Sequence, residues 1–220
     1  MKYYIIVDLE MCNVPYGSLN RKNIKDEIIQ IGAVKMDENY EVVDGFDTYV
    51  KPEYGRVSRK ITKLTGIRPC HVDSAILLKD AMDAFIKWLP EDYCMVSWSM
   101  SDRRQFENEL YAKRINLGWL LEVYGSWRDC QKMFGDKLST ERQYRLQEAL
   151  VASDIIAPGR QHDGLADAYN TALLFKRLET EPDYKLNEYY LQAISTENQP
   201  VMGYSLGDCL KGLCIDQISA

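Results

Sequence analysis

Near its N-terminus the chain carries a short apolar run that ends in two carboxylates, Tyr3-Tyr4-Ile5-Ile6-Val7-Asp8-Leu9-Glu10. Aromatic and β-branched residues favour an extended strand, which we predict over residues 2–9. Alternate side chains of a strand project from the same face. Asp8 and Glu10 are therefore expected to face the same side at the end of a core strand.

Three residues farther along the chain could join these two acids in one site, because each lies near the predicted start of a helix. Asp102 follows a predicted strand over 92–98 and falls in the first turn of a predicted helix. His162 and Asp167 lie at the start of a long helical pattern. On one continuous helix their side chains would diverge by roughly 140°. They can share a site only if the helix begins after His162, and Asp163-Gly164 is compatible with such a start.

Four acids and one histidine are the residue types that a two-metal phosphodiesterase requires. Two divalent ions roughly 3.5–4 Å apart activate a water and stabilise the leaving oxygen. Hard ions such as Mg²⁺ and Mn²⁺ prefer oxygen ligands. We expect Asp8 to bridge both ions and Glu10 to bind one. Asp102 and Asp167 would complete the coordination, and His162 is a suitable general base for the attacking water.

Each of these residues also has an ordinary structural explanation when it is taken alone. Acids at strand ends are common, and Asp102 at a helix N-terminus complements the helix dipole. His162 alone is more simply explained as a surface or capping histidine. The combination, and no single residue, favours the metal site.

Composition indicates one compact domain. A chain of 220 residues with 46% hydrophobic content can bury a full core. No stretch reaches the ~18 apolar residues of a membrane span, and the N-terminal run is too short for a signal peptide. The six cysteines form no Cys-x-x-Cys pair, which argues against a zinc site and is typical of reduced thiols. We therefore expect a cytoplasmic protein with no membrane partner.

The net charge of −6 argues against broad binding of duplex nucleic acid. The acids of a catalytic site contribute to that total, and bound cations would offset them locally. A short single-stranded end is therefore the expected ligand. Basic residues form four clusters, each of which alone is more simply explained as a solvated face: Arg21, Lys22 and Lys25; Arg56, Arg59, Lys60 and Lys63; Arg103 and Arg104; Arg142 and Arg145.

The order of predicted elements indicates an α/β fold, a mixed β-sheet of about five strands flanked by helices. The strands are expected at 2–9, 27–36, 41–51, 92–98 and near 126–130. Helices are expected from Ser58 to Gly66, over 75–89 with Ser74 as N-cap, and at about 102–114, 144–153 and 163–179. We expect the domain to span 1–178. The C-terminal extension, 179–220, would dock on it through a short helix near 206–213, or serve as a partner-binding tail.

The motifs resemble those of a known enzyme family. Asp8-Leu9-Glu10, Ser97-Trp98-Ser99-Met100-Ser101-Asp102 and His162-x4-Asp167 are similar to the three motifs of the DEDDh group, the histidine branch of the DnaQ-like 3′→5′ exonucleases. The segments 27–34, 64–67 and 164–172 extend the resemblance, and the pattern is most similar to Eri-type and bacterial KapD-like members. The resemblance implies an RNase H-like fold, two Mg²⁺ or Mn²⁺ ions and release of 5′-mononucleotides from a 3′ end. It also implies that the four acids are ligands and that His162 is the base.

Two departures from the family pattern concern the substrate. Ser101 stands where relatives often carry an aromatic or acidic residue, and the first motif lacks the usual Thr-Gly that follows it. Met11, Leu64 and Thr65 are expected to pack against the last nucleotides, since apolar contacts hold bases without sequence preference. Met11 is equally well explained as a core residue.

The sequence thus predicts a 3′→5′ exonuclease that acts on single-stranded RNA, or on DNA, with RNA weakly favoured. A non-catalytic nucleic-acid or protein adapter with the same fold is one alternative, although an adapter would be expected to have lost an acid. A metal-dependent nucleotidase or phosphatase for small nucleotides is another. The sequence names no protein partner.

Overall fold

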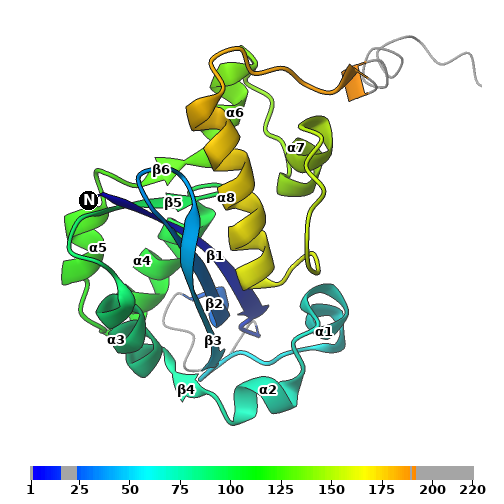
Figure 1. Ribbon diagram of the computed structural model, residues 1–220. Helices are drawn as coiled ribbons and strands as arrows, with labels where there is room; N and C mark the ends of the chain where they lie inside the picture. Colours follow the sequence, from blue (N-terminus) through cyan, green and yellow to red (C-terminus); the bar gives the residue numbers. More distant parts are fainter. Residues whose placement is uncertain (1, 16–23, 189, 192–220) are drawn as a thin grey trace, which may run out of the picture.

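A six-stranded mixed sheet forms the centre of the molecule in the order β4-β3-β2-β1-β5-β6 (Figure 1). The computed structural model describes residues 2–15, 24–188 and 190–191. β1 pairs antiparallel with β2 and parallel with β5, so it lies inside the sheet. The strands are β1 Tyr3–Asn13, β2 Asp26–Met36, β3 Val42–Lys51, β4 Ile76–Leu77, β5 Tyr93–Ser97 and β6 Arg128–Asp129.

Helices cover both faces of this sheet. They are α1 Arg59–Thr65, α2 Pro69–Asp73, α3 Leu78–Trp88, α4 Ser101–Lys113, α5 Gly118–Val123, α6 Cys130–Lys137, α7 Leu146–Ala152 and α8 Gly164–Thr180. α3, α4 and α5 pack on the face that carries Ile5, Val7 and Leu9. α6, α7 and α8 pack on the face that carries Ile6, which is also the face of Asp8 and Glu10.

The first turn of α8 lies directly on the backbone of β1 and β2. A Cβ placed on Gly32 would lie 2.1 Å from the carbonyl carbon of Gly164, and one placed on Gly164 would lie 3.2 Å from the carbonyl oxygen of Asp8. The Gly164 N–H also donates to Gln30 Oε1 at 3.1 Å. Two glycines therefore allow the helix to approach the sheet closely at the point where Asp8 projects.

A buried ion cluster holds the other end of α4 against β2. Lys113 Nζ lies 2.8 Å from Glu27 Oε1 and 2.9 Å from Glu109 Oε1, and all three side chains are buried. Glu109 Oε2 accepts a hydrogen bond from the Ile28 N–H at 2.8 Å. This cluster fixes the position of α4, whose first turn carries Asp102.

α1 forms as predicted between Ser58 and Gly66. The Ser58 side chain accepts from the Ile61 N–H, and Gly66 ends the helix in the left-handed conformation with φ of 80°. Its buried face, Ile61 with Val57, packs against Cys12 and neighbouring apolar residues at the ends of β1 and β2.

The mixed α/β architecture expected from the sequence is confirmed, with one strand more than expected. The helix predicted from residue 75 begins at Leu78, and Ser74 ends α2 instead of starting α3. Ile76 and Leu77 pair with Val50 and Lys51 at the open edge of β3. Pairing with the free edge of β3, which the β-branched Ile76 favours, outweighs the helical pattern at these two residues.

The described part of the C-terminal extension contacts the domain. Tyr184 packs in the apolar cluster under α8 and exchanges a hydrogen bond with Ser153. The Asn187 N–H donates to the Ala152 carbonyl at 2.7 Å. The helix predicted near 206–213 lies outside the described residues. In the described part of the chain, no helix is both long and apolar enough to cross a bilayer.

We predict that Gly32→Ala disrupts both stability and activity. The new Cβ would overlap backbone atoms of α8 at 2.1 Å, and a rotamer change cannot relieve an overlap with backbone. Thermal unfolding followed by circular dichroism should show a loss of roughly 5 °C or more in Tm. Gly45→Ala is the matched control on β3, since its Cβ would meet no atom closer than 3.7 Å. Equal Tm values for the two variants would contradict the close seating of α8.

Candidate active site

The five residues predicted to form the site line one cleft of about 760 Å³. Its floor is the end of β1, and the first turns of α4 and α8 form its sides. The lining residues are Asp8, Leu9, Glu10, Met11, Leu64, Trp98, Ser99, Ser101, Asp102, Gln131, Gln143, Tyr144, Arg145, Leu146, Gln147, Gln161, His162 and Asp167. The structure therefore brings together three segments that are far apart in the sequence.

β1 continues past the predicted end of its strand and carries both acids within the sheet. Asp8 lies opposite Gly32 in the register with β2, and Glu10 lies opposite Gln30. The register shifts between Glu10 and Met11. Both acids are on the strand face that α8 covers, as the alternation of side chains predicted.

Asp102 is anchored to the backbone of β1 between these two acids. It is buried in the first turn of α4, and its Oδ1 accepts a hydrogen bond from the Leu9 N–H at 3.2 Å. The Ser101 hydroxyl donates to Oδ2 at 3.4 Å. The short Ser101 side chain thus supports the neighbouring acid instead of offering a stacking surface.

His162 lies outside α8. This agrees with the expectation that His162 and Asp167 can share a site only if the helix begins after His162. Its φ is 58°, and the helix begins at Gly164 after the Asp163 side chain accepts from the Ala166 N–H. The backbone N–H of His162 donates to Asp167 Oδ2 at 2.8 Å. One side-chain donor atom each from Glu10, His162 and Asp167 lies within 4.8 Å of the others.

Burial raises the pKa of the acids in the cleft, and neighbouring like charges add to the rise for Asp8 and Glu10. Burial, with the charges of Asp102 and Glu10 next in importance, raises the pKa of Asp8 well above its usual value. Burial and the charge of Asp167 raise the pKa of Glu10 to about 8. For Asp102, burial raises the pKa to about 7 against the opposing hydrogen bond from Leu9. Ionising all of these acids at once costs free energy, and a bound cation would offset that cost.

The donor set fits a hard divalent cation. Asp167 Oδ1 is buried and has no hydrogen-bond partner of normal geometry, although the nearby Asn170 amide opposes the rise in the pKa of Asp167 that burial causes. An unpaired buried carboxylate oxygen close to another carboxylate, here that of Glu10, is typical of a metal ligand. Asp8, Glu10, Asp102 and Asp167 are the residues that would hold such ions.

Two of the three predicted substrate contacts lie at the cleft. Met11 and Leu64 line it, and Leu64 is exposed. Thr65 does not line it. Its side chain is buried, its hydroxyl donates to the Ile61 carbonyl and accepts from the Ile67 N–H, and it thus closes the end of α1.

One wall of the cleft was not foreseen from the sequence. It consists of Trp98 and Gln131 with the segment 143–147. The Tyr144 carbonyl accepts hydrogen bonds from the Trp98 indole N–H and from the Gln131 side-chain amide, which hold this segment at the cleft. Residues 139–145 have no regular secondary structure, so no periodic pattern marked them.

Comparisons with known proteins agree on one family. The family model RNase_T, described as Exonuclease, matches residues 5–175. A mouse relative, ERI1 exoribonuclease 2, is 27% identical and covers 93% of this chain and 33% of its own. A DNA polymerase III of the PolC type from Caldanaerobacter subterraneus is 29% identical and covers 90% of this chain and 13% of its own. This chain thus spans a third or less of the length of these relatives.

A solved structure shows the same fold. The nuclease domain of 3'hExo, a DEDDh family member bound to rAMP, superposes with a TM-score of 0.68 at 24% identity and covers 84% of this chain and 96% of its own. The expected RNase H-like exonuclease fold is thereby confirmed.

We predict that the metal-free protein loses stability as pH rises from about 4 to 8. In that range the unfolded chain has released protons that Asp8, Glu10 and Asp102 retain in the fold, so ionising them in the fold costs free energy. Glu10→Gln should raise Tm in EDTA at pH 8 and make Tm depend less on pH. It should also reduce the rise in Tm that Mn²⁺ causes. The measurement is thermal unfolding with EDTA and with Mn²⁺. A wild-type Tm that does not respond to Mn²⁺ at pH 8 would contradict the metal site.

Proposed function

The chain belongs to the RNase_T exonuclease family, and on this basis we propose that it is a 3′→5′ exonuclease that removes nucleotides from single-stranded RNA. The observation that carries the proposal is the convergence of four carboxylates and one histidine in a single cleft. RNA is favoured over DNA because one relative is named an exoribonuclease and the superposed nuclease domain holds rAMP.

Two Mg²⁺ or Mn²⁺ ions held by the four acids would activate a water and stabilise charge on the 3′ oxygen that leaves. Asp8 has the central position, because the charges of the other three acids all act on it. A backbone N–H holds one oxygen of Asp102 and one of Asp167, which orients both side chains, and Asp167 Oδ1 is left without a hydrogen-bond partner of normal geometry.

The position of His162 supports a role as the base that accepts the proton of the attacking water. Its side chain is exposed at the cleft, and its backbone N–H is bound to Asp167, so the ring extends beside the acids. The water oxygen would bond to phosphorus as the bond to the 3′ oxygen breaks, and the products are a 5′-mononucleotide and a new 3′ hydroxyl.

The alternatives from the sequence explain the site less well. A binding adapter has no need of four acids in one cleft whose pKa values burial raises, with like charges adding to the rise for Asp8 and Glu10. A nucleotidase for small nucleotides would use the same acids, and competition between mononucleotides and oligonucleotides separates it from an exonuclease. The cytoplasmic location expected from the cysteines stays a prediction.

We predict that Asp8→Ala abolishes a nuclease activity that requires Mn²⁺ or Mg²⁺. The change removes the acid at the centre of the cluster, and loss of a ligand should cost more than the 10–100-fold typical of groups that only support ligands. Single-stranded RNA labelled at its 5′ end should give a ladder that shortens from the 3′ end. The same ladder on matched DNA measures the preference for RNA.

Gly45→Ala serves as the active control for this assay, because its site on β3 has room for a Cβ. An Asp8→Ala preparation as active as wild type would mean that the activity is a contaminant. A wild-type protein that cleaves only mononucleotides would support the nucleotidase.

We predict that His162→Ala lowers kcat by roughly 10²–10⁴-fold while Mn²⁺ still raises Tm, as expected for a general base that is not a ligand. The two roles must be separated because His162 lies within 4.8 Å of possible ligand atoms of Glu10 and Asp167. Single-turnover kinetics and thermal unfolding with Mn²⁺ are the two measurements. Loss of the Mn²⁺ effect in His162→Ala, to the extent seen in Asp167→Asn, would make His162 a ligand.

A further inference from the structure

The segment that contains α1 is strongly basic in a protein of net negative charge. Between Gly55 and Val72 the chain has no aspartate or glutamate, while the whole molecule has a net charge of −6. Within this segment we define the α1 basic patch as four residues that are all exposed: Arg56, Arg59, Lys60 and Lys63. α1 buries its apolar face against the sheet ends, so this charge faces outward.

Among the described residues, the α1 basic patch has no partner for its charge. Across residues 2–15 and 24–188, none of the four side chains forms an ion pair or a hydrogen bond. Two other basic clusters each contain an arginine that is engaged. Arg103 stacks on Tyr124 and donates to its carbonyl, and Arg142 pairs with Glu148. A single exposed charge is simply explained by contact with solvent. Four positive charges with no acid among them repel one another, and a bound anion would relieve that repulsion.

The patch adjoins the catalytic cleft. Leu64, which lines the cleft, follows Lys63 on α1. Arg160 donates to the carbonyls of Lys63 and Leu64 at 3.0 and 3.4 Å, so its guanidinium lies at the end of α1. A Cβ on Gly66 would meet that guanidinium at 2.0 Å. The loop that carries His162 is thereby tied to α1, and the two lie side by side in Figure 1.

We propose that the α1 basic patch binds backbone phosphates of the single strand just upstream of its 3′ end. This inference rests on the proposed exonuclease function and adds a site outside the cleft. α1 has seven residues, so its charges lie within roughly 10 Å of Leu64, a distance that the next nucleotides of a strand leaving the cleft would span. Contacts of this kind are independent of base sequence and weaken with salt.

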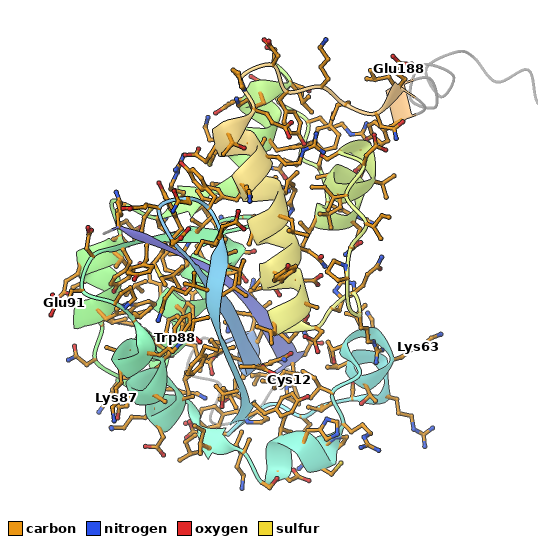
Figure 2. All side chains as sticks on the ribbon, in the orientation of Figure 1. Cys12, Lys63, Lys87, Trp88, Glu91 and Glu188 are labelled. Carbon is orange, nitrogen blue, oxygen red and sulfur yellow. The ribbon has the colours of Figure 1, made fainter. Side chains whose placement is uncertain are left out.

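The test compares a substrate that fills only the cleft with one that also reaches the patch. A dinucleotide is the short probe, and an oligouridine of about 20 nucleotides is the long one. The patch variant is Arg59→Gln with Lys63→Gln, residues one turn apart on α1. The matched control removes two charges from α3 through Lys79→Gln with Lys87→Gln; Figure 2 shows Lys63 and Lys87 on opposite sides of the molecule.

The patch variant should raise KM for the long substrate by roughly tenfold and leave its kcat unchanged. Its kinetics on the dinucleotide should equal those of wild type. The slope of log kcat/KM against log salt should become shallower by about 0.7 for each phosphate that the variant no longer binds. The α3 variant should match wild type on both substrates.

Two results would overturn the proposal. One is an equal change on the short and the long substrate, which would place the effect in the cleft or in the fold. The other is an unchanged KM and salt slope on the long substrate, which would leave the patch free for a different partner, such as an acidic protein. Failure of the proposed function is a separate result, because wild type itself would then cleave neither substrate.

Discussion

The close seating of α8 on the central strands is the constraint on which the rest of the site depends. Gly32 leaves no room for a Cβ between sheet and helix and Gly164 leaves little, so the first turn of α8 lies against the backbone of Asp8. Asp167 and His162 are positioned by that turn. If the helix stood farther from the sheet, as it would with side chains at the two glycines, the acids of β1 and α8 could not share a cation.

Two groups of buried acids show how the protein treats negative charge differently in structure and in function. Burial alone would raise the pKa of Glu27, but Lys113 donates to it and brings that pKa below its usual value. The cleft acids Asp8 and Glu10 have no such lysine, since no ion pair joins them to a basic residue in the described ranges, and their pKa values rise. The fold therefore supplies Glu27 with a cation of its own and leaves the cleft acids to a cation from solution.

Local patterns were enough to predict most of the fold and the five central residues. The alternation in β1 gave the shared face of Asp8 and Glu10, and helix geometry required the break that the structure shows at His162. Contacts between distant segments were not predictable. Tyr144 lies at the cleft only because Trp98 and Gln131 hold its carbonyl, and a pairing with β3 at the sheet edge turned residues 76 and 77 into a strand.

Binding of divalent metal where three distant segments meet can be observed directly. The decisive experiment is anomalous diffraction from crystals soaked in Mn²⁺ and a 5′-mononucleotide. We expect two Mn²⁺ peaks bound by Asp8, Glu10, Asp102 and Asp167, with the nucleotide phosphate between the ions and His162 beside it but outside their coordination. Mn²⁺ peaks elsewhere, or a cleft that binds nucleotide without any ion, would contradict the metal centre.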